Sequence, residues 1–376
     1  MLYTVLSVGD GACSVVRGWP GCEVMLVDCG TVGNGGVSAS KTLAIELDWH
    51  SILVNTVVVT HFDLDHWRGL RDLPQHWRHP PVGEVEFRYP ALLPGDAGLI
   101  QKAHFAFQAI RLSGPIFGAL DVIGTWERAG VVIRRRPSYR GDWFFGGGTH
   151  WDVHWPPASD KYFDDGMRRR MRALGSETRR LAEEVPRFGE ALDAVQSIWF
   201  DRENSTDRKD HPLNDITGGE LFSNLQEALG EKKFTAFASR ISKFTNELSM
   251  VHSSEDVVNF GDCEKGGLKA LMEMEQVDPS LAKFYSVILA PHHGTAKVER
   301  VVQDRFPRSL LGLVSQNGRT RYLKGLQEEQ KQFKDAVTNG VGVKIDTYNP
   351  AVPASLLGPH VRFWLPTHPL KTGHLH

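Results

Sequence analysis

The stretch that decides the fold runs from Val57 to Leu70 and reads Val-Val-Val-Thr-His-Phe-Asp-Leu-Asp-His-Trp-Arg-Gly-Leu. Its valines are typical of a buried strand. Four potential metal ligands follow within six residues, namely His61, Asp63, Asp65 and His66. Imidazole and carboxylate together suit Zn, Mn or Fe at a hydrolytic centre, and a set without thiolates argues against a closed structural zinc site. The alternative is a polar loop whose side chains only cap the following helix.

The composition excludes several classes of protein. The chain has 376 residues, of which 41% are hydrophobic and 23% charged, as in soluble globular proteins. Its net charge of -2 means that any contact with nucleic acid must use a local basic patch. The four cysteines form no CxxC pair, which favours a reducing, cytoplasmic setting over a disulfide framework. We expect no signal peptide, because the N-terminus lacks a basic region and reaches Asp10 too early. We expect no membrane span, because no apolar run reaches about 18 residues.

The pattern of apolar runs predicts one α/β domain over residues 1–376 with an insertion. Short strands and a helix open the chain up to about residue 90, and further strands are expected at Glu247–His252, Val257–Phe260, Tyr285–Ala290 and Leu310–Ser315. Residues 92–243 are richer in charge and largely of helical period. Strand-forming segments near 125–157, beginning at Thr125, interrupt this insertion. A late helix is expected over Tyr322–Val337.

Three more strand candidates end in acidic or histidine residues. Val24–Val27 leads to Asp28, and Val257–Phe260 leads to Asp262. Each of these alone is the pattern of an ordinary turn. The third, Val287–Ala290, is followed by His292 and His293, and paired histidines behind a buried strand are a stronger sign of a metal site.

The window from His61 to His66 resembles the HxHxDH signature of the metallo-β-lactamase fold, with Asp63 where the second His usually stands. The Pro291–Thr295 segment is similar to the PHHGS motif of the ComEC-type competence-protein branch of this fold, the soluble domain attached to a DNA-uptake channel. Val8–Ala12, Asn246–Ser249 and His154–Pro157 match further motifs of that branch. The resemblance covers residues 2–90, 150–157 and 245–318.

This resemblance implies a four-layer αββα sandwich that holds two divalent metal ions, Zn or Mn and possibly Mg. It implies that Asp28 supports the ligands from behind, that Asp262 bridges the ions, and that Asp65 and Asp262 are catalytic. The implied metal ligands are His61, Asp63, Asp65, His66, Asp262 and one of His292 and His293. Relatives supply a further His before the bridging Asp, for which His150, His154, His211 and His252 are the candidates.

Such a centre predicts hydrolysis by a metal-activated water, without a Ser or Cys nucleophile. The oxygen-rich ligand set, the resemblance and arginine clusters such as Arg168–Arg170 favour a phosphodiesterase or nuclease acting on nucleic acid. Such arginine runs are more often solvated helix faces. One alternative is a small-molecule hydrolase for a lactone, β-lactam or phosphoester. Another is a metal-poor module that binds a protein partner through the insertion. The sequence does not predict the oligomeric state.

Overall fold

The computed structural model describes residues 1–9, 11–18, 23–31, 38–49, 53–81, 83–112, 122–200, 217–316, 337–338, 343–346 and 361–365. Three features of the sequence analysis fall outside these ranges: Asp10, His211 and the expected helix Tyr322–Val337 except for its last residue.

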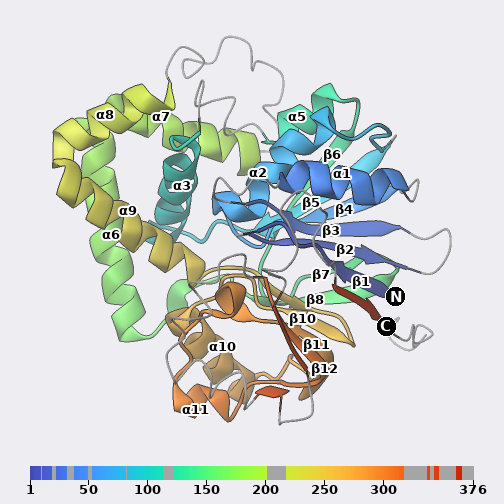
Figure 1. Cartoon of the computed structure of the whole chain (residues 1–376). Helices are drawn as coiled ribbons and strands as arrows, with labels where there is room; N and C mark the ends of the chain where they lie inside the picture. The colour runs from blue at the N-terminus through green and yellow to red at the C-terminus, as the bar shows by residue number, and fades with distance from the viewer. Residues whose placement is uncertain are drawn as a thin grey trace, which may run out of the picture.

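Two sheets form the centre of the structure (Figure 1). The first has the order β14 (Val361–Trp364), β1 (Leu2–Val5), β2 (Cys13–Arg17), β3 (Val24–Cys29), β4 (Val54–Val58), β5 (Glu84–Pro90) and β6 (Val132–Ser138). The second has the order β13 (Val343–Asp346), β12 (Arg308–Ser315), β11 (Phe284–Leu289), β10 (Val257–Asn259), β9 (Val251–Ser253), β8 (Thr149–Trp155) and β7 (Trp143–Gly146). Strands β3 to β6 are mutually parallel, and so are β10 to β13.

The alternation of side chains along each strand explains why the sheets are buried on both faces. In β3, Met25 and Val27 belong to the apolar core between the sheets, whereas Val24 and Leu26 belong to the core beneath the helices. Met250, Val287 and their neighbours line the same inter-sheet core from the other side. A strand with apolar side chains on both faces, such as β3, is therefore suited to the centre of the sandwich.

Helices cover the outer faces of both sheets. Figure 1 shows α1 (Ala39–Trp49), α2 (Leu64–Asp72) and α5 (Val122–Arg128) over the first sheet, and α10 (Lys265–Val277) and α11 (Arg300–Gln303) over the second. Helix, sheet, sheet and helix follow one another, so the expected four-layer αββα sandwich is confirmed. No helix among the described residues is long and apolar enough to cross a membrane.

The segment from residue 92 to 243 contributes a group of helices to one side of the sandwich (Figure 1). They are α3 (Asp96–Ala109), α6 (Asp165–Glu184), α7 (Pro186–Val195), α8 (Gly218–Leu229) and α9 (Glu231–Asn246). Helix α3 contacts α6, α7 and α9. The same segment supplies β6 to the first sheet and β7 and β8 to the second.

Two expected strands are wrong in part. Thr125 to Arg128 end helix α5, because Trp126 packs edge-on against Phe87 and its Nε1 donates a hydrogen bond to the Leu70 carbonyl at 2.8 Å. The strand begins only at Val132. At Glu247–His252 the strand starts at Val251, because α9 continues to Asn246.

Burial of His252 predicts a loss of stability in acid. This side chain is fully buried against the rings of Trp151 and Phe144, and burial lowers its pKa to about 4. In the unfolded chain the His252 side chain takes up a proton near pH 6.5, whereas in the folded chain it does so only near pH 4. The stability that the protein has above pH 6.5 is therefore lost as the pH falls toward 4.

We expect the wild type to lose about 2 kcal/mol of unfolding free energy from this group between pH 7.5 and pH 5, and His252→Phe to show a correspondingly flatter pH dependence. Urea unfolding at several pH values measures it. His79→Gln, at an exposed histidine, should keep the wild-type slope, and equal slopes for all three proteins would contradict the prediction.

Candidate metal centre

The carboxyl ends of four parallel strands bring the expected ligands together. Asp28 is the last but one residue of β3, and His61 follows β4 after Val59 and Thr60. From the second sheet, Asp262 follows β10, and His292 and His293 follow β11. Because the ends of parallel strands face the same edge of a sheet, both sheets present polar side chains at one edge of the sandwich.

Asp63 stands at the N-cap position of α2 but does not cap the helix. Its backbone is extended, with φ -75° and ψ 144°, and its carboxylate makes no capping hydrogen bond. Instead its Oδ2 lies 3.4 Å from His61 Nε2, and its Oδ1 lies 2.7 Å from His104 Nε2. The interpretation of this stretch as a mere capping loop therefore fails for Asp63.

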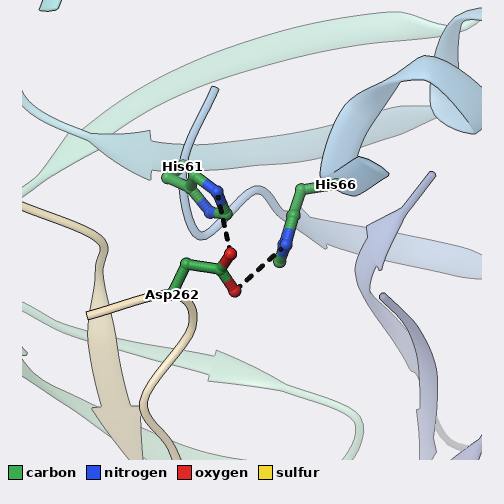
Figure 2. Close-up of side chains that lie close together, drawn as sticks. All are labelled: His61, His66 and Asp262. Carbon is green, nitrogen blue, oxygen red and sulfur yellow. Dashed lines mark ion pairs between the residues drawn. The ribbon is translucent and has the colours of Figure 1, made fainter. Parts of the chain in front are cut away.

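Figure 2 shows the first group of converging donors, His61, His66 and Asp262. Nε2 of His61 is 3.7 Å from Asp262 Oδ2, and Nε2 of His66 is 3.2 Å from Asp262 Oδ1. All three side chains are buried, and one donor atom from each lies within 4.8 Å of the others. This spacing suits a metal ion held between them.

A second group shares His66 and adds Asp65 and His293. His293 Nε2 is 3.4 Å from Asp65 Oδ2, 3.3 Å from His66 Nε2 and 3.4 Å from Asp262 Oδ2. Asp262 thus contacts both groups, which is the position that a bridging carboxylate requires. The two groups adjoin, and because both use Nε2 of His66, that nitrogen can serve only one cation at a time.

Strained backbone aims several of these side chains. Asp28, His292 and His293 have φ of 53°, 49° and 53°, in the left-handed region that residues other than glycine seldom adopt. Gly30 allows the end of β3 to approach the start of α2 closely, since a Cβ there would overlap the backbone of Asp65 and His66. Such conformations persist only where the surrounding packing enforces them.

Asp28 holds the ligand loop from behind. Its carboxylate accepts hydrogen bonds from the Thr60 amide at 2.7 Å and the Thr60 hydroxyl at 2.8 Å. Oδ2, the oxygen that accepts from the Thr60 hydroxyl, also lies 2.9 Å from His66 Nδ1. A carboxylate there keeps a proton on Nδ1, so that Nε2, which faces Asp262, is the nitrogen available to a cation.

The centre concentrates charge in a buried place. Burial raises the pKa of Asp262, but His293, His66, His61 and His292 outweigh this and hold it well below its usual range. Burial lowers the pKa of His293, but Asp262 and Asp65 outweigh this and raise it to about 10. The anionic carboxylate therefore stabilises positive charge around it, from protons or from metal ions.

Sequence reasoning missed His104, a buried histidine of α3. The next turn of the same helix carries Gln108, whose Nε2 donates a hydrogen bond to Asp63 Oδ1. From α9, the Asn246 side chain reaches Asp63 Oδ2 at 3.3 Å and donates to it when its amide nitrogen, rather than its oxygen, is turned toward the carboxylate. No motif surrounds His104, since its neighbours Ala103, Phe105 and Ala106 are those of an ordinary buried helix.

Three of the four histidines proposed from the sequence as the further ligand lie elsewhere, and His211 is outside the described residues. His150 is exposed and pairs with Asp152 at 2.9 Å. His154 bonds Ser253 and Ser280, and His252 packs among aromatic rings. Of the paired histidines, His293 approaches both Asp65 and Asp262, whereas His292 lies 3.7 Å from Asp262 and 2.9 Å from Glu264 Oε1.

The donor set fits divalent cations. Nε2 of His61 and Nε2 of His104 are both buried and form no well-directed hydrogen bond, although the Asp63 carboxylate lies 3.4 Å from the first and 2.7 Å from the second. A cation held between these nitrogens and Asp63 would satisfy both of them. Imidazole and carboxylate donors suit Zn and Mn, and carboxylate oxygens can also bind Mg.

Fold and site together define a metallo-β-lactamase-like α/β protein with a candidate metal centre. Residues 6–159, less than half of the chain, match the family model of the Metallo-beta-lactamase superfamily. The chain is also similar to the crystal structure of a long form RNase Z from yeast, with 10% identity and a TM-score of 0.35, over 77% of this chain and 32% of that one. It spans about a third of that protein's length. No curated protein matches the chain significantly. The ComEC-type branch stays a prediction.

Replacing Asp28 should weaken metal binding without removing a ligand. We expect Asp28→Asn to lower the affinity for Zn or Mn about 10- to 100-fold, because His66 loses its orienting carboxylate. Isothermal titration calorimetry of the EDTA-treated protein measures it. The matched control is Asp152→Asn, which removes the carboxylate from the exposed His150 pair of equal length and should bind metal like the wild type.

Proposed function

We propose that this protein is a metal-dependent hydrolase that cleaves phosphodiester bonds of nucleic acid. The observation that supports it best is the pair of overlapping donor groups, His61, His66 and Asp262 beside Asp65, His66 and His293. Two-cation centres of this kind are typical of phosphodiester hydrolysis, because two ions can stabilise both the attacking and the leaving oxygen.

We assign the residues as follows. His61 and Asp262 of the first group, together with Asp63 and His104 beside His61, would hold one cation. Asp65, His66 and His293 would hold the other, which Asp262 also faces. Asp63 in place of a histidine adds a negative charge and a hard oxygen donor, which shifts the preference from Zn toward Mn or Mg. His292 stands at the margin, where Glu264 holds its Nδ1.

Cations bound at this centre would polarise the scissile P–O bond and lower the pKa of an attacking water. The chain's own residues prepare the site for them. Thr60 and Asp28 fix the tautomer of His66, while Gln108 and Asn246 orient the carboxylate of Asp63. This preorganisation spares the centre reorganisation during the reaction.

The arginine clusters give less support to a nucleic-acid substrate than the sequence suggested. Arg168 pairs with Asp165 at 2.7 Å, and Arg170 pairs with Glu247 at 2.6 Å. Arg180 pairs with Glu184 at 2.6 Å. The choice of a phosphodiester therefore rests on the metal centre, where Asp63, Asp65 and Asp262 add oxygen donors to the histidines.

A small-molecule hydrolase is the second candidate. The cleft beside the centre has a volume of about 670 Å³ and a partly apolar lining, which also suits a lactone or a small phosphoester. Strong dependence of substrate binding on salt is expected for nucleic acid and not for a neutral small molecule. A partner-binding module without metal would lack tightly bound cations altogether.

The intact protein should cleave DNA or RNA when Mn, Mg or Zn is added. In the double variant Asp65→Ala, His66→Ala the rate should fall at least about 100-fold, because donors of both groups are lost. The control double variant, Asp152→Ala with His150→Ala, removes an exposed Asp–His pair and should retain the wild-type rate. Gel assays with linear DNA, circular DNA and RNA measure cleavage. Inactivity of the intact, metal-loaded protein on all three would contradict the proposal.

His104 offers a test of the first cation place by metal content. We expect His104→Ala to bind one divalent ion where the wild type binds two, as measured by elemental analysis after dialysis. His154→Ala, at a histidine buried to the same extent, should retain both ions. If His104→Ala does not fold, as judged by circular dichroism, His104→Gln preserves the bulk of the side chain and takes its place. Two ions retained in the folded variant would exclude His104 as a ligand.

A further inference from the structure

A cleft opens directly from the candidate metal centre into the helical segment. Its volume is about 670 Å³. Asp63, His104, Asn246 and His292 form the end at the metal centre. The sides are the C-terminal part of α3, helix α9 and a residue of α8, so both sides come from the segment between residues 92 and 246.

The lining changes in character away from the centre. Two positively charged side chains lie near the metal centre, those of Arg111 after α3 and Lys243 in the last turn of α9. Glu264 also borders the cleft, but its carboxylate is held by His292 Nδ1 at 2.9 Å. Positive charge from the turn after α3 and from α9 therefore lines the cleft near the metal centre.

The far part of the cleft is aromatic. Phe222 of α8 is 37% exposed and packs edge-on against Phe234, at 5.4 Å between ring centroids. Phe234 in turn packs edge-on against Phe107, at 5.5 Å. These contacts fix the ring of Phe222 at the cleft, where its exposed face can pack against a flat apolar group.

The cleft is also coupled to the metal centre. Arg111 Nη1 donates a hydrogen bond to Gln108 Oε1 at 3.1 Å, and Gln108 donates to Asp63. Asn246, one turn after Lys243, donates to the other oxygen of Asp63. Each cationic side of the cleft thus adjoins a group that orients a candidate metal ligand.

We propose that this cleft binds an unpaired nucleotide unit, with its phosphate between Arg111 and Lys243 and its base against Phe222. The inference rests on the proposed function and adds the substrate class, namely single-stranded nucleic acid. Basic side chains that follow the backbone together with an aromatic ring that stacks on a base are the usual means of binding single strands. In a duplex the base is paired and stacked, and it reaches Phe222 only after extrusion.

The test compares a 10-nucleotide single strand, its duplex and a dinucleotide as substrates of the metal-loaded protein. We expect the single strand to have the lowest KM or to share it with the dinucleotide, and the duplex the highest. Arg111→Gln, Lys243→Gln and Phe222→Ala should each raise the KM for the single strand about tenfold, because each removes one phosphate or stacking contact. Arg111→Gln and Lys243→Gln should also make binding less dependent on salt concentration, each by about the amount expected for one lost phosphate contact.

Matched controls stand outside the cleft. Lys233→Gln removes an exposed lysine from the same helix α9, and Phe284→Ala removes a phenylalanine that is 48% exposed at the start of β11. Both should keep the wild-type KM and salt dependence. A tenfold effect in these controls, or preference for the duplex, would overturn the assignment of the cleft.

The two proposals fail in different ways. Cleavage of nucleic acid with unchanged KM in all three cleft variants would overturn the cleft and leave the hydrolase standing. No cleavage of nucleic acid or of bis(4-nitrophenyl) phosphate by the wild type would overturn the hydrolase. In that case fluorescence anisotropy with the labelled single strand in EDTA tests the cleft on its own. The cleft proposal requires that Lys243→Gln bind the strand more weakly than Lys233→Gln does.

Discussion

The carboxylate of Asp262 is the constraint on which the rest of the site depends. It is buried, and an unpaired ionised group in such a place would be prohibitively costly. Four histidines surround it: His61, His66, His292 and His293. His61 and His66 come after β4 of the first sheet, His292 and His293 come after β11 of the second, and Asp262 itself follows β10. The sandwich can therefore close at this edge only when both sheets place their strand ends in register.

This requirement explains the unusual backbone around the centre. Asp28, His292 and His293 adopt left-handed φ angles that cost energy in isolation. Each of these residues contacts a buried charged partner, so the electrostatic gain and the packing of the strands offset the local cost. Hydrogen bonds support the same arrangement, since Asp28 accepts from the Thr60 amide and hydroxyl and contacts His66, and so fixes the segment that carries His61 and His66. Strain and charge pairing act as one unit.

The sequence revealed the parts of the site that are local. The strand of valines followed by His61, Asp63, Asp65 and His66 can be recognised from the sequence, because the strand pattern and the spaced ligands lie in one short segment. Asp262 and His293 were legible for the same reason, each directly behind a strand. His104 was not, because its proximity to Asp63 depends on how α3 packs against the sandwich. The helix at Thr125–Arg128 escaped likewise, since it depends on the contact of Trp126 with Phe87.

The helical segment determines what the sandwich edge can do. A metal centre at the ends of strands is open to solvent and would accept many substrates. Here α3 and α9 stand beside it, and the same two helices that line the cleft also hold Asp63, through Gln108 and Asn246. A ligand that displaced Arg111 from Gln108 would therefore act on the orientation of Asp63 as well as on its own binding. Substrate recognition and the geometry of the metal centre are in this way parts of one hydrogen-bonded arrangement.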